Sequence, residues 1–330
     1  MAETVNKVFA NLHLTLFEIQ QIPGKGRGLL ATSDIAKGTR IVSEKPLFTI
    51  NSMAQPTLEE VLAKKLKALP KEQQRQFLSL HNNFPGPYPF SGIVKTNCLP
   101  CGVGSPIGGA YPTICLINHS CLPNAHCNWN EDYEVETVHA TSLIKAGEEI
   151  TINYSDEGPS YVRQARLRKS FGFDCNCIVC SLPKQELEAS DARRLEIQRL
   201  DEAIGDPVRM RDRPSASLAD CRSLANIIKE EYGDPMDPLY ARLYYDAFQI
   251  CAGHGDRVRA SVFAEKAYKI RVMCEGEDSS LTKRTKRFAD DPTSHSTFGV
   301  YSKKWKGPGK FSPSSLDAAD FEAWLWRRAV

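Results

Sequence analysis

Three cysteines in one short segment are the clearest candidates for chemistry in this sequence. They form the run Cys175-x-Cys177-x-x-Cys180, which places three soft ligands within six residues. Such spacing suits a tight knuckle around a tetrahedral zinc ion, and a closed structural zinc site needs a fourth ligand. Spacing alone does not identify that ligand, because five more cysteines precede the run: Cys98, Cys101, Cys115, Cys121 and Cys127.

A glycine-rich segment near the N-terminus is a second candidate. Gly24, Gly26 and Gly28 alternate with Lys25 and Arg27 between two apolar stretches. Glycines let the backbone turn sharply or approach a ligand closely. The segment lacks the Gly-Lys-Ser/Thr ending of a phosphate-binding loop. Taken alone, it fits a plain hairpin turn better than a cofactor loop.

A dense polar run follows the apolar stretch YPTICLI in the middle of the chain. It begins with Asn118 and His119 and ends at Asn124. Buried polar side chains must find hydrogen-bond partners, so such a run usually fixes a backbone crossing or binds a ligand. His119 taken singly fits a hydrogen-bonded structural histidine. Tyr154, which ends the apolar stretch GEEITINY, taken singly fits the core better than a catalytic site.

Short strands are predicted around these motifs. Residues 12–50 have strand-like patterns on both sides of the glycine-rich turn, and residues 93–154 predict strands and loops, including YEVETVHA and GEEITINY. Between them, residues 56–83 place apolar side chains at helical spacing, with Pro70 where a second helix would begin. Residues 160–171 predict a basic helix that leads into the cysteine run.

Beyond Pro183 the sequence changes to long helical stretches. The predicted helices cover about 185–204, 216–232, 237–253 and 256–275. Asp256 is placed to cap the last of them. Ser, Thr, Lys and Pro are frequent over 279–315, where we expect a long loop or partial disorder. The stretch FEAWLWRR at 321–328 predicts a short helix whose aromatic side chains dock onto the other helices.

The bulk composition narrows the class of protein. The 42 basic and 40 acidic residues nearly cancel, so no strong field indicates a nucleic acid or a membrane surface. No apolar run approaches the roughly 20 residues that span a bilayer. The N-terminal MAETVNKVFA lacks the pattern of a secretory signal. We therefore expect a nuclear or cytoplasmic protein, where reducing conditions favour metal binding over disulfides.

Taken in order, four motifs resemble those of the SET-domain lysine methyltransferases. They are Gly-Lys-Gly-Arg-Gly, Asn-His-Ser-Cys-x-Pro-Asn, Gly-Glu-Glu-Ile-Thr-Ile-Asn-Tyr and Phe-x-Phe-x-Cys-x-Cys-x-x-Cys, and the resemblance covers about residues 12–181. It is greatest to the SMYD-like branch and to fungal SET proteins, although nothing like the MYND zinc finger follows EKPLFTI.

The resemblance implies an α+β protein with a SET fold of small β-sheets and a knot-like crossing. Residues 1–170 would form the SET domain, with a helical insert at about 56–84. Residues 171–183 would form a zinc-bound post-SET segment. Residues 184–330 would form an α-helical, tetratricopeptide-like C-terminal domain.

The resemblance also implies roles for single residues. Binding of S-adenosylmethionine falls to Lys25, Gly26, Arg27, Asn97, Asn118, His119, Tyr154 and Phe173. Phe173 would pack on the adenine ring. Phe171 and Tyr154 would line the channel for the incoming lysine, with Tyr154 as the catalytic residue. The family pattern also selects the fourth ligand of a single structural zinc ion, whose ligands would be Cys121, Cys175, Cys177 and Cys180.

The implied activity is transfer of a methyl group from S-adenosylmethionine to a lysine of a histone or another protein. The expected partner is therefore a protein that presents a lysine. A catalytically silent, cofactor-binding interaction module is the first alternative, and a zinc-stabilised scaffold that binds no cofactor is the second. The C-terminal helices would either recognise a peptide or only cover the active site. The segment 160–171 carries the basic side chains Arg163, Arg166, Arg168 and Lys169. A solvated helix face explains them better than attraction of acidic substrates.

Overall fold

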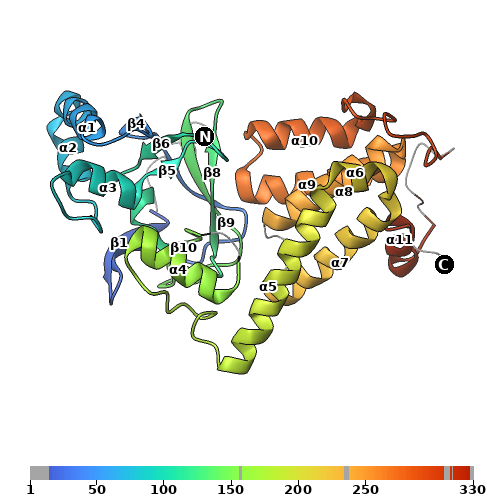
Figure 1. Ribbon diagram of the computed structural model, residues 1–330, viewed down its shortest axis with the longest axis horizontal. Helices are drawn as coiled ribbons and strands as arrows, with labels where there is room; N and C mark the ends of the chain where they lie inside the picture. The colour runs from blue at the N-terminus through green and yellow to red at the C-terminus, as the bar shows by residue number, and fades with distance from the viewer. Residues whose placement is uncertain (1–14, 156–157, 234–237, 308–312, 314, 328–330) are drawn as a thin grey trace, which may run out of the picture.

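The computed structural model describes residues 15–155, 158–233, 238–307, 313 and 315–327. Figure 1 shows that the strands gather on one side of the molecule and the long C-terminal helices on the other. The predicted α+β class is therefore confirmed. Among the helices so described, none is both long and apolar enough to cross a membrane.

Three small sheets form the strand-rich part. The first has the strand order β1 (Phe17–Ile22), β2 (Gly26–Ala31), β10 (Glu149–Ile152) and β7 (Asn118–His119). The second has the order β3 (Arg40–Glu44), β9 (Val135–Ala140) and β8 (Ala125–Asn130). The third has the order β4 (Phe48–Asn51), β6 (Ile107–Ala110) and β5 (Leu99–Pro100).

The first sheet brings together motifs that are far apart in the sequence. Strands β1 and β2 form an antiparallel hairpin, and Gly24 and Gly26 at its turn have φ angles of 74° and 76°, which glycine adopts without strain. Strand β10 lies antiparallel to β2 and parallel to β7, with Thr151 opposite Asn118 and Ile152 opposite His119. The glycine-rich turn, the Asn-His pair and the strand before Tyr154 therefore meet in one sheet.

Three helices lie beside the third sheet. Helices α1 (Thr57–Ala68) and α2 (Lys71–Leu78) match the two predicted helices, and Pro70 directly precedes α2. Helix α3 (Pro89–Asn97) was not predicted, since strands and loops were expected from residue 93. The carboxylate of Glu59 in α1 accepts hydrogen bonds from the backbone N–H groups of Phe90 (3.0 Å) and Ser91 (2.8 Å). Pro89 is a local start signal at the first position of α3, but the tertiary contact that caps the helix cannot be read from the local sequence.

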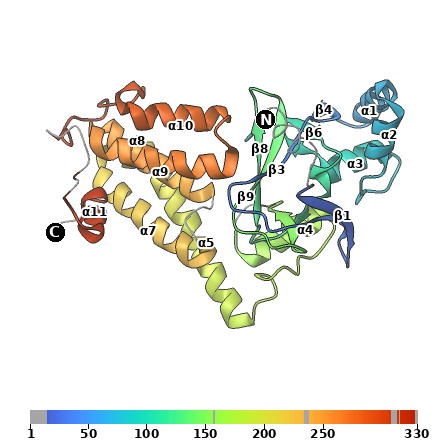
Figure 2. The ribbon, with the colours of Figure 1, turned by 180° about the vertical axis from the view of Figure 1, so that it is seen from behind.

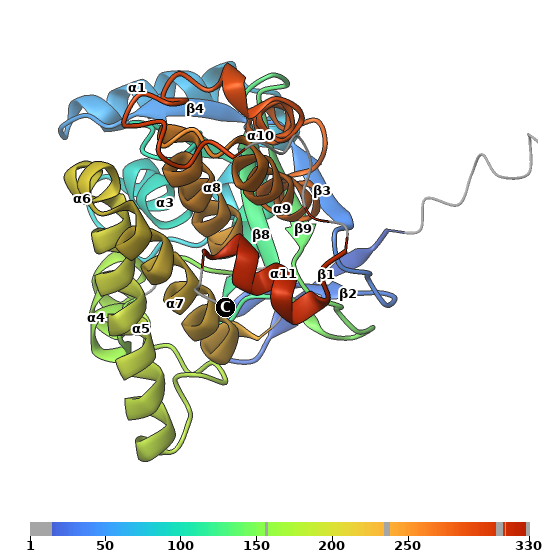
Figure 3. The same ribbon diagram turned by 90° about the vertical axis from the view of Figure 1, so that its right-hand side faces the viewer.

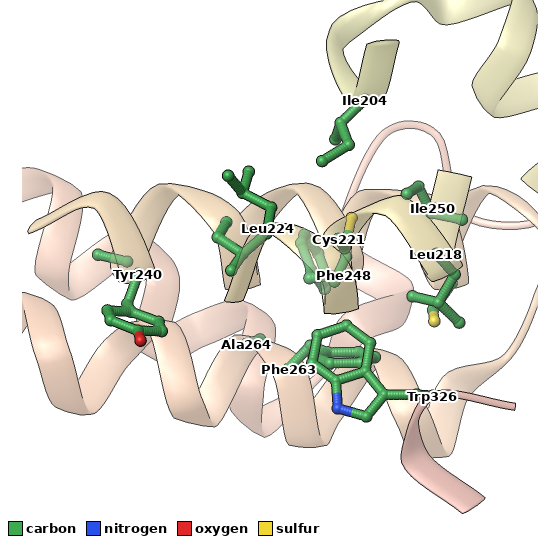
Figure 4. Packing of buried hydrophobic residues seen from close by; sticks show 14 of the residues in the cluster. Ile204, Leu218, Cys221, Leu224, Tyr240, Phe248, Ile250, Phe263, Ala264 and Trp326 are labelled. Carbon is green, nitrogen blue, oxygen red and sulfur yellow. The ribbon is translucent and has the colours of Figure 1, made fainter. Parts of the chain in front are cut away.

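The remaining helices follow the strands in the chain. They are α4 (Ser160–Phe171), α5 (Lys184–Gly205), α6 (Pro207–Asp212), α7 (Pro214–Tyr232), α8 (Pro238–Gly253) and α9 (Arg257–Glu275). Asp256 caps α9 as predicted, because its side chain accepts from the Arg259 N–H. Figure 4 shows the core of this helical part, in which Phe248, Phe263 and Trp326 lie among aliphatic side chains.

The expectation of a loop over 279–315 is wrong for its first part. Helix α10 (Ser280–Asp290) and the short 3₁₀ helix η2 (Pro292–Ser294) occupy it. The inner face of α10 is buried, and Phe288 stacks on Phe248 with ring centroids 5.3 Å apart. The predicted aromatic helix is α11 (Ala318–Leu325), nearest the viewer in Figure 3, and Trp326 after it packs on Phe263.

The two parts of the molecule contact each other along α9 and the second sheet (Figure 2). A Cβ atom on Gly38 would lie 2.5 Å from Met273 Cε of α9, so the backbone at Gly38 approaches α9 closely. Arg40 of β3 pairs with Asp278, and Lys283 Nζ lies 2.8 Å from Asp132 Oδ2. These contacts lie along the boundary between the helices and the strand-rich part.

Candidate active site and metal centre

Gly28 lets the hairpin approach the Asn-His segment closely. A Cβ atom there would lie 2.8 Å from Asn118 Nδ2 and 3.1 Å from Glu149 Oε1, so any larger residue would displace its neighbours. Gly28 is therefore required because there is no room for a side chain, and not because of an unusual φ angle. It allows β2 to lie directly against β7 and β10.

Glu149 is the polar centre of this meeting point. Asn118 Nδ2 donates to Glu149 Oε1 (2.8 Å), and Lys25 Nζ lies 2.6 Å from Glu149 Oε2. Asn118 Nδ2 also donates to the Arg27 carbonyl oxygen (3.1 Å). Together these bonds fix the backbone of the glycine-rich turn. Glu149 was not among the predicted site residues, although it is the second Glu of the GEEITINY motif.

Two predicted cofactor residues have side chains that point away from this centre. The Arg27 guanidinium donates through Nη2 to Ser79 Oγ (3.3 Å), beyond the end of α2, so only its backbone stays with Asn118. The side-chain amide of Asn97 donates to the carbonyl oxygens of His81 and Ile93, both at 2.7 Å. The Asn97 amide is thus engaged with the insert helices rather than with the hairpin.

An aromatic cluster surrounds the tyrosine that follows β10. The ring of Tyr154 lies 4.9 Å from that of Phe171, at the end of α4, and 5.4 Å from that of His119 on β7. Phe173 completes the group, with its ring 6.1 Å from His119. Four predicted site residues from three separate segments therefore lie together. Their rings form one aromatic cluster beside strand β7, which carries Asn118.

The hydroxyl and the backbone N–H of Tyr154 both hydrogen-bond to residues 117–119. Its hydroxyl donates to the Ile117 carbonyl, and its backbone N–H donates to His119 Nδ1 (3.0 Å). Burial raises the pKa of Tyr154 well above the ordinary phenol range, so the hydroxyl keeps its proton at neutral pH. Burial lowers the pKa of His119 to about 4, so the imidazole is neutral. The site thus contains a neutral, oriented phenol.

Four cysteine sulfurs gather beside the aromatic cluster, all within 4.8 Å of one another: Cys121, Cys175, Cys177 and Cys180. The Sγ atom of Cys121 lies 3.6 Å from that of Cys180 and 3.9 Å from that of Cys175. Zinc–sulfur bonds of about 2.3 Å in a tetrahedron place the sulfurs roughly 3.8 Å apart, so the cluster fits a zinc ion. Three competing cysteines instead pack against the core of the strand-rich part: Cys98, Cys115 and Cys127.

Arg163 lies against this cluster, without exposed surface. Its Nε donates to Cys121 Sγ (3.2 Å) and its Nη1 to the Gly158 carbonyl (2.6 Å). The interpretation of a solvated helix face is therefore wrong for Arg163, whereas Arg168 and Lys169 are exposed as expected. The basic residues of α4 look alike in sequence, and only the fold decides which of them faces the sulfurs.

A second buried arginine holds Cys121 from the helical part. Arg194 of α5, also without exposed surface, donates through Nη2 to the Cys121 carbonyl (3.3 Å). Its Nε donates to Glu231 of α7 (2.6 Å), a carboxylate whose side chain is 2% exposed. The cysteine cluster is thus anchored to the C-terminal helices by a compensated buried charge.

Comparison with known proteins decides the family. The SET domain family matches residues 26–155 of this chain. Histone-lysine N-methyltransferase set5 of Schizosaccharomyces pombe is 35% identical over 287 residues, which cover 85% of this chain and 85% of that protein. The chain belongs to the SET-domain lysine methyltransferases. Human N-lysine methyltransferase SMYD2 is 36% identical over 107 residues, which cover 32% of this chain and 24% of that protein.

In this SET-domain protein, the family match includes the hairpin from Gly26, the Asn118–His119 crossing and Tyr154. The cysteine run and both phenylalanines lie beyond it. Among solved structures, Rubisco LSMT bound to AdoMet is 13% identical, with a TM-score of 0.37 over 88% of this chain and 91% of that one.

Proposed function

We propose that this SET-domain protein transfers the methyl group of S-adenosylmethionine to the side-chain nitrogen of a lysine on a histone or another protein. The observation that carries the proposal is the position of Tyr154. It lies in an aromatic cluster with His119, Phe171 and Phe173, directly beside the paired strands β7 and β10. The set5 protein of fission yeast, similar over most of its length, is named as a histone-lysine methyltransferase.

The cofactor would bind where the hairpin meets the Asn-His segment. In the proposal it contacts Lys25, Gly26, Arg27, Asn97, Asn118, His119, Tyr154 and Phe173. The backbone of the glycine-rich turn offers polar groups that the Asn118 and Glu149 bonds hold in place. Phe173 offers an aromatic face for the adenine ring. When bound, S-adenosylmethionine supplies an electrophilic methyl group on a positively charged sulfur.

The lysine must be neutral to attack that methyl group. Free lysine has a pKa near 10.4, so its neutral form costs about 4 kcal/mol at pH 7.4. Aromatic walls from Phe171 and Tyr154 disfavour the ammonium form by desolvation and so lower this cost. The Tyr154 hydroxyl, protonated and fixed by the Ile117 carbonyl, presents its oxygen to orient the amine and the methyl group. Catalysis then rests on positioning and desolvation.

A structural zinc ion is part of the proposal, with the ligands Cys121, Cys175, Cys177 and Cys180. Such a site contributes on the order of 10 kcal/mol to ordering a short segment. Phe171 and Phe173 directly precede the cysteine run, so zinc would fix both rings beside Tyr154. The sulfur positions support this assignment.

We further propose the division into a SET domain (1–170, insert 56–84), a post-SET segment (171–183) and a helical domain (184–330). The helical domain would cover the active site or take a peptide of the substrate protein. A nuclear or cytoplasmic location agrees with a protein substrate of this kind.

The proposal is tested by following radiolabelled methyl transfer from S-adenosylmethionine to histones and to a whole-cell protein mixture. Wild type should label protein, while Tyr154→Phe should lose nearly all turnover, because the hydroxyl that orients the reacting groups is gone. Calorimetry with S-adenosylhomocysteine serves as the control, and both proteins should bind it measurably. Cofactor binding without any transfer by wild type would instead indicate the catalytically silent interaction module.

A further inference from the structure

The Cys121 sulfur faces two N–H donors besides its three cysteine neighbours. His119 Nε2 lies 3.3 Å from Cys121 Sγ, and Arg163 Nε lies 3.2 Å from the same atom. All three residues are buried, at 5%, 0% and 1% exposed surface for His119, Arg163 and Cys121. Metal-bound thiolates are strong acceptors, and such outer partners tune the affinity and electronic state of the metal.

The hydrogen bonds fix the tautomer of His119. The backbone N–H of Tyr154 can only donate, and it points at His119 Nδ1 at 3.0 Å. Nδ1 must therefore be the unprotonated nitrogen, and the neutral ring carries its proton on Nε2. That proton points at Cys121 Sγ. A directed chain thus runs from the Tyr154 backbone through the imidazole to a sulfur of the cysteine cluster.

The positive charge of Arg163 complements the negative charge that a filled zinc site would carry. Four thiolates around one Zn²⁺ give a net charge of about −2. The carboxylate beside Arg163, Asp191, has its Oδ1 3.8 Å from Nη1 and already accepts from the Ser160 N–H (2.6 Å). A fully buried guanidinium needs a close negative partner, and the sulfurs at 3.2 and 3.7 Å provide one.

We propose that His119 and Arg163 are positioning residues of the zinc site. The His119 imidazole connects the Cys121 thiolate to the Tyr154 backbone, and Arg163 stabilises the thiolate cluster. This inference rests on the proposed function, and it gives the imidazole a task other than contact with the cofactor. Loss of the metal then loosens the catalytic tyrosine directly, in addition to the segment that carries Phe171 and Phe173.

Two substitutions of His119 separate its hydrogen bond with the Tyr154 backbone from its hydrogen bond with the Cys121 sulfur. In His119→Asn the amide oxygen takes the place of Nδ1, so the Tyr154 contact stays and the donor to sulfur is lost. In His119→Gln the amide nitrogen takes the place of Nε2, so the donor to sulfur stays and the Tyr154 contact is lost. Arg163→Met removes the second donor and the charge. Lys169→Met is the matched control, because it removes an exposed charge from the same helix.

The test uses the full chain loaded with cobalt(II), whose thiolate charge-transfer absorption reports hydrogen bonding to sulfur. His119→Asn and Arg163→Met should shift this band to longer wavelength and weaken metal binding about 10- to 100-fold, whereas His119→Gln and Lys169→Met should match wild type. Both His119 variants should lower kcat at least tenfold, with a smaller change in KM for S-adenosylmethionine. If Arg163→Met does not fold, Arg163→Lys keeps the charge, loses the Nε donor and should show the same spectral shift.

Unchanged cobalt spectra and metal affinities in His119→Asn and in the folded Arg163 variant would overturn the inference. A loss of S-adenosylmethionine affinity in both His119 variants with no change in kcat would also overturn it, since the imidazole would then serve only the cofactor. The spectra do not depend on methyl transfer. Absence of transfer by wild type would therefore remove the proposed function while leaving the spectral test valid.

Discussion

Replacing Gly28 by alanine tests whether the crossing depends on close approach of the hairpin. The added methyl group would lie 2.6 Å from Ile22 Cγ1 and 2.8 Å from Asn118 Nδ2. Neither distance is tolerated, so Asn118 must move. Its hydrogen bonds to the Arg27 carbonyl (3.1 Å) and to Glu149 (2.8 Å) would then be lost or lengthened.

The expected cost follows from these contacts. Overpacking in a well-packed region costs about 1–3 kcal/mol. Each lost hydrogen bond adds about 1 kcal/mol. The free energy of unfolding of Gly28→Ala should therefore fall by about 3–5 kcal/mol, a large part of the roughly 5–15 kcal/mol that stabilises a typical domain. The affinity for S-adenosylhomocysteine should fall as well, because the turn and Asn118 are no longer aligned.

Urea unfolding and calorimetry with S-adenosylhomocysteine measure these two effects. Gly24→Ala is the matched control, because Gly24 has nothing within 4 Å of a new Cβ and requires only a φ of 74°. That conformation costs an alanine about 1–2 kcal/mol, and the cofactor affinity should change little. If Gly28→Ala is as stable as wild type and binds S-adenosylhomocysteine equally well, the close approach is not what aligns the site.

Three more predictions follow from the structure. Cys177→Ser should release zinc, measured by metal analysis, and lower activity; full activity of a zinc-free protein would contradict the role of the metal. Burial raises the pKa of Glu136 to about 8 from 4.5. The folded state therefore holds a proton that the unfolded state releases between those values, and stability falls as pH rises through this window. Glu136→Gln should remove that fall, on the order of 1–4 kcal/mol in urea unfolding between pH 5 and 8, and an unchanged pH slope would show that Glu136 is not the cause. Lys283→Ala, which breaks an exposed pair with Asp132, should change stability by less than about 0.5 kcal/mol, and a larger loss would mean that the pair fastens the two parts of the molecule.

Strands around the motifs, the first two helices and the long C-terminal helices could be predicted from the sequence, because local patterns carry them. The grouping of the motifs was implied by the family resemblance. The stretches YEVETVHA and GEEITINY, the latter behind the turn at Gly147, predicted β9 and β10, and helical spacing predicted α1 and α2. The cysteine run indicated a metal site. The choice of Cys121 among five cysteines required the family resemblance, since only the fold brings Cys121 next to Cys175, which follows it 54 residues later in the sequence.

Features set by tertiary contacts could not be predicted. The N-terminus of helix α3 is capped by Glu59, which lies some thirty residues earlier in the sequence. Helix α10 has a mostly polar sequence, and only a narrow face of it is buried. The burial of Arg163 depends on which side of α4 meets the sulfurs. Glu149 lies in the GEEITINY motif, but its partner Lys25 comes from the turn between β1 and β2 and its partner Asn118 from β7. Such pairings exist only after the chain has folded.

Mass spectrometry of a methylated protein mixture tests the central claim most directly. The chain is incubated with S-adenosylmethionine that carries a deuterated methyl group, and peptides are searched for the heavy methyl. We expect heavy methyl on lysine side chains with wild type, and almost none with Tyr154→Phe. Heavy methyl on arginine instead of lysine, or equal labelling by both proteins, would contradict a lysine methyltransferase that acts through Tyr154.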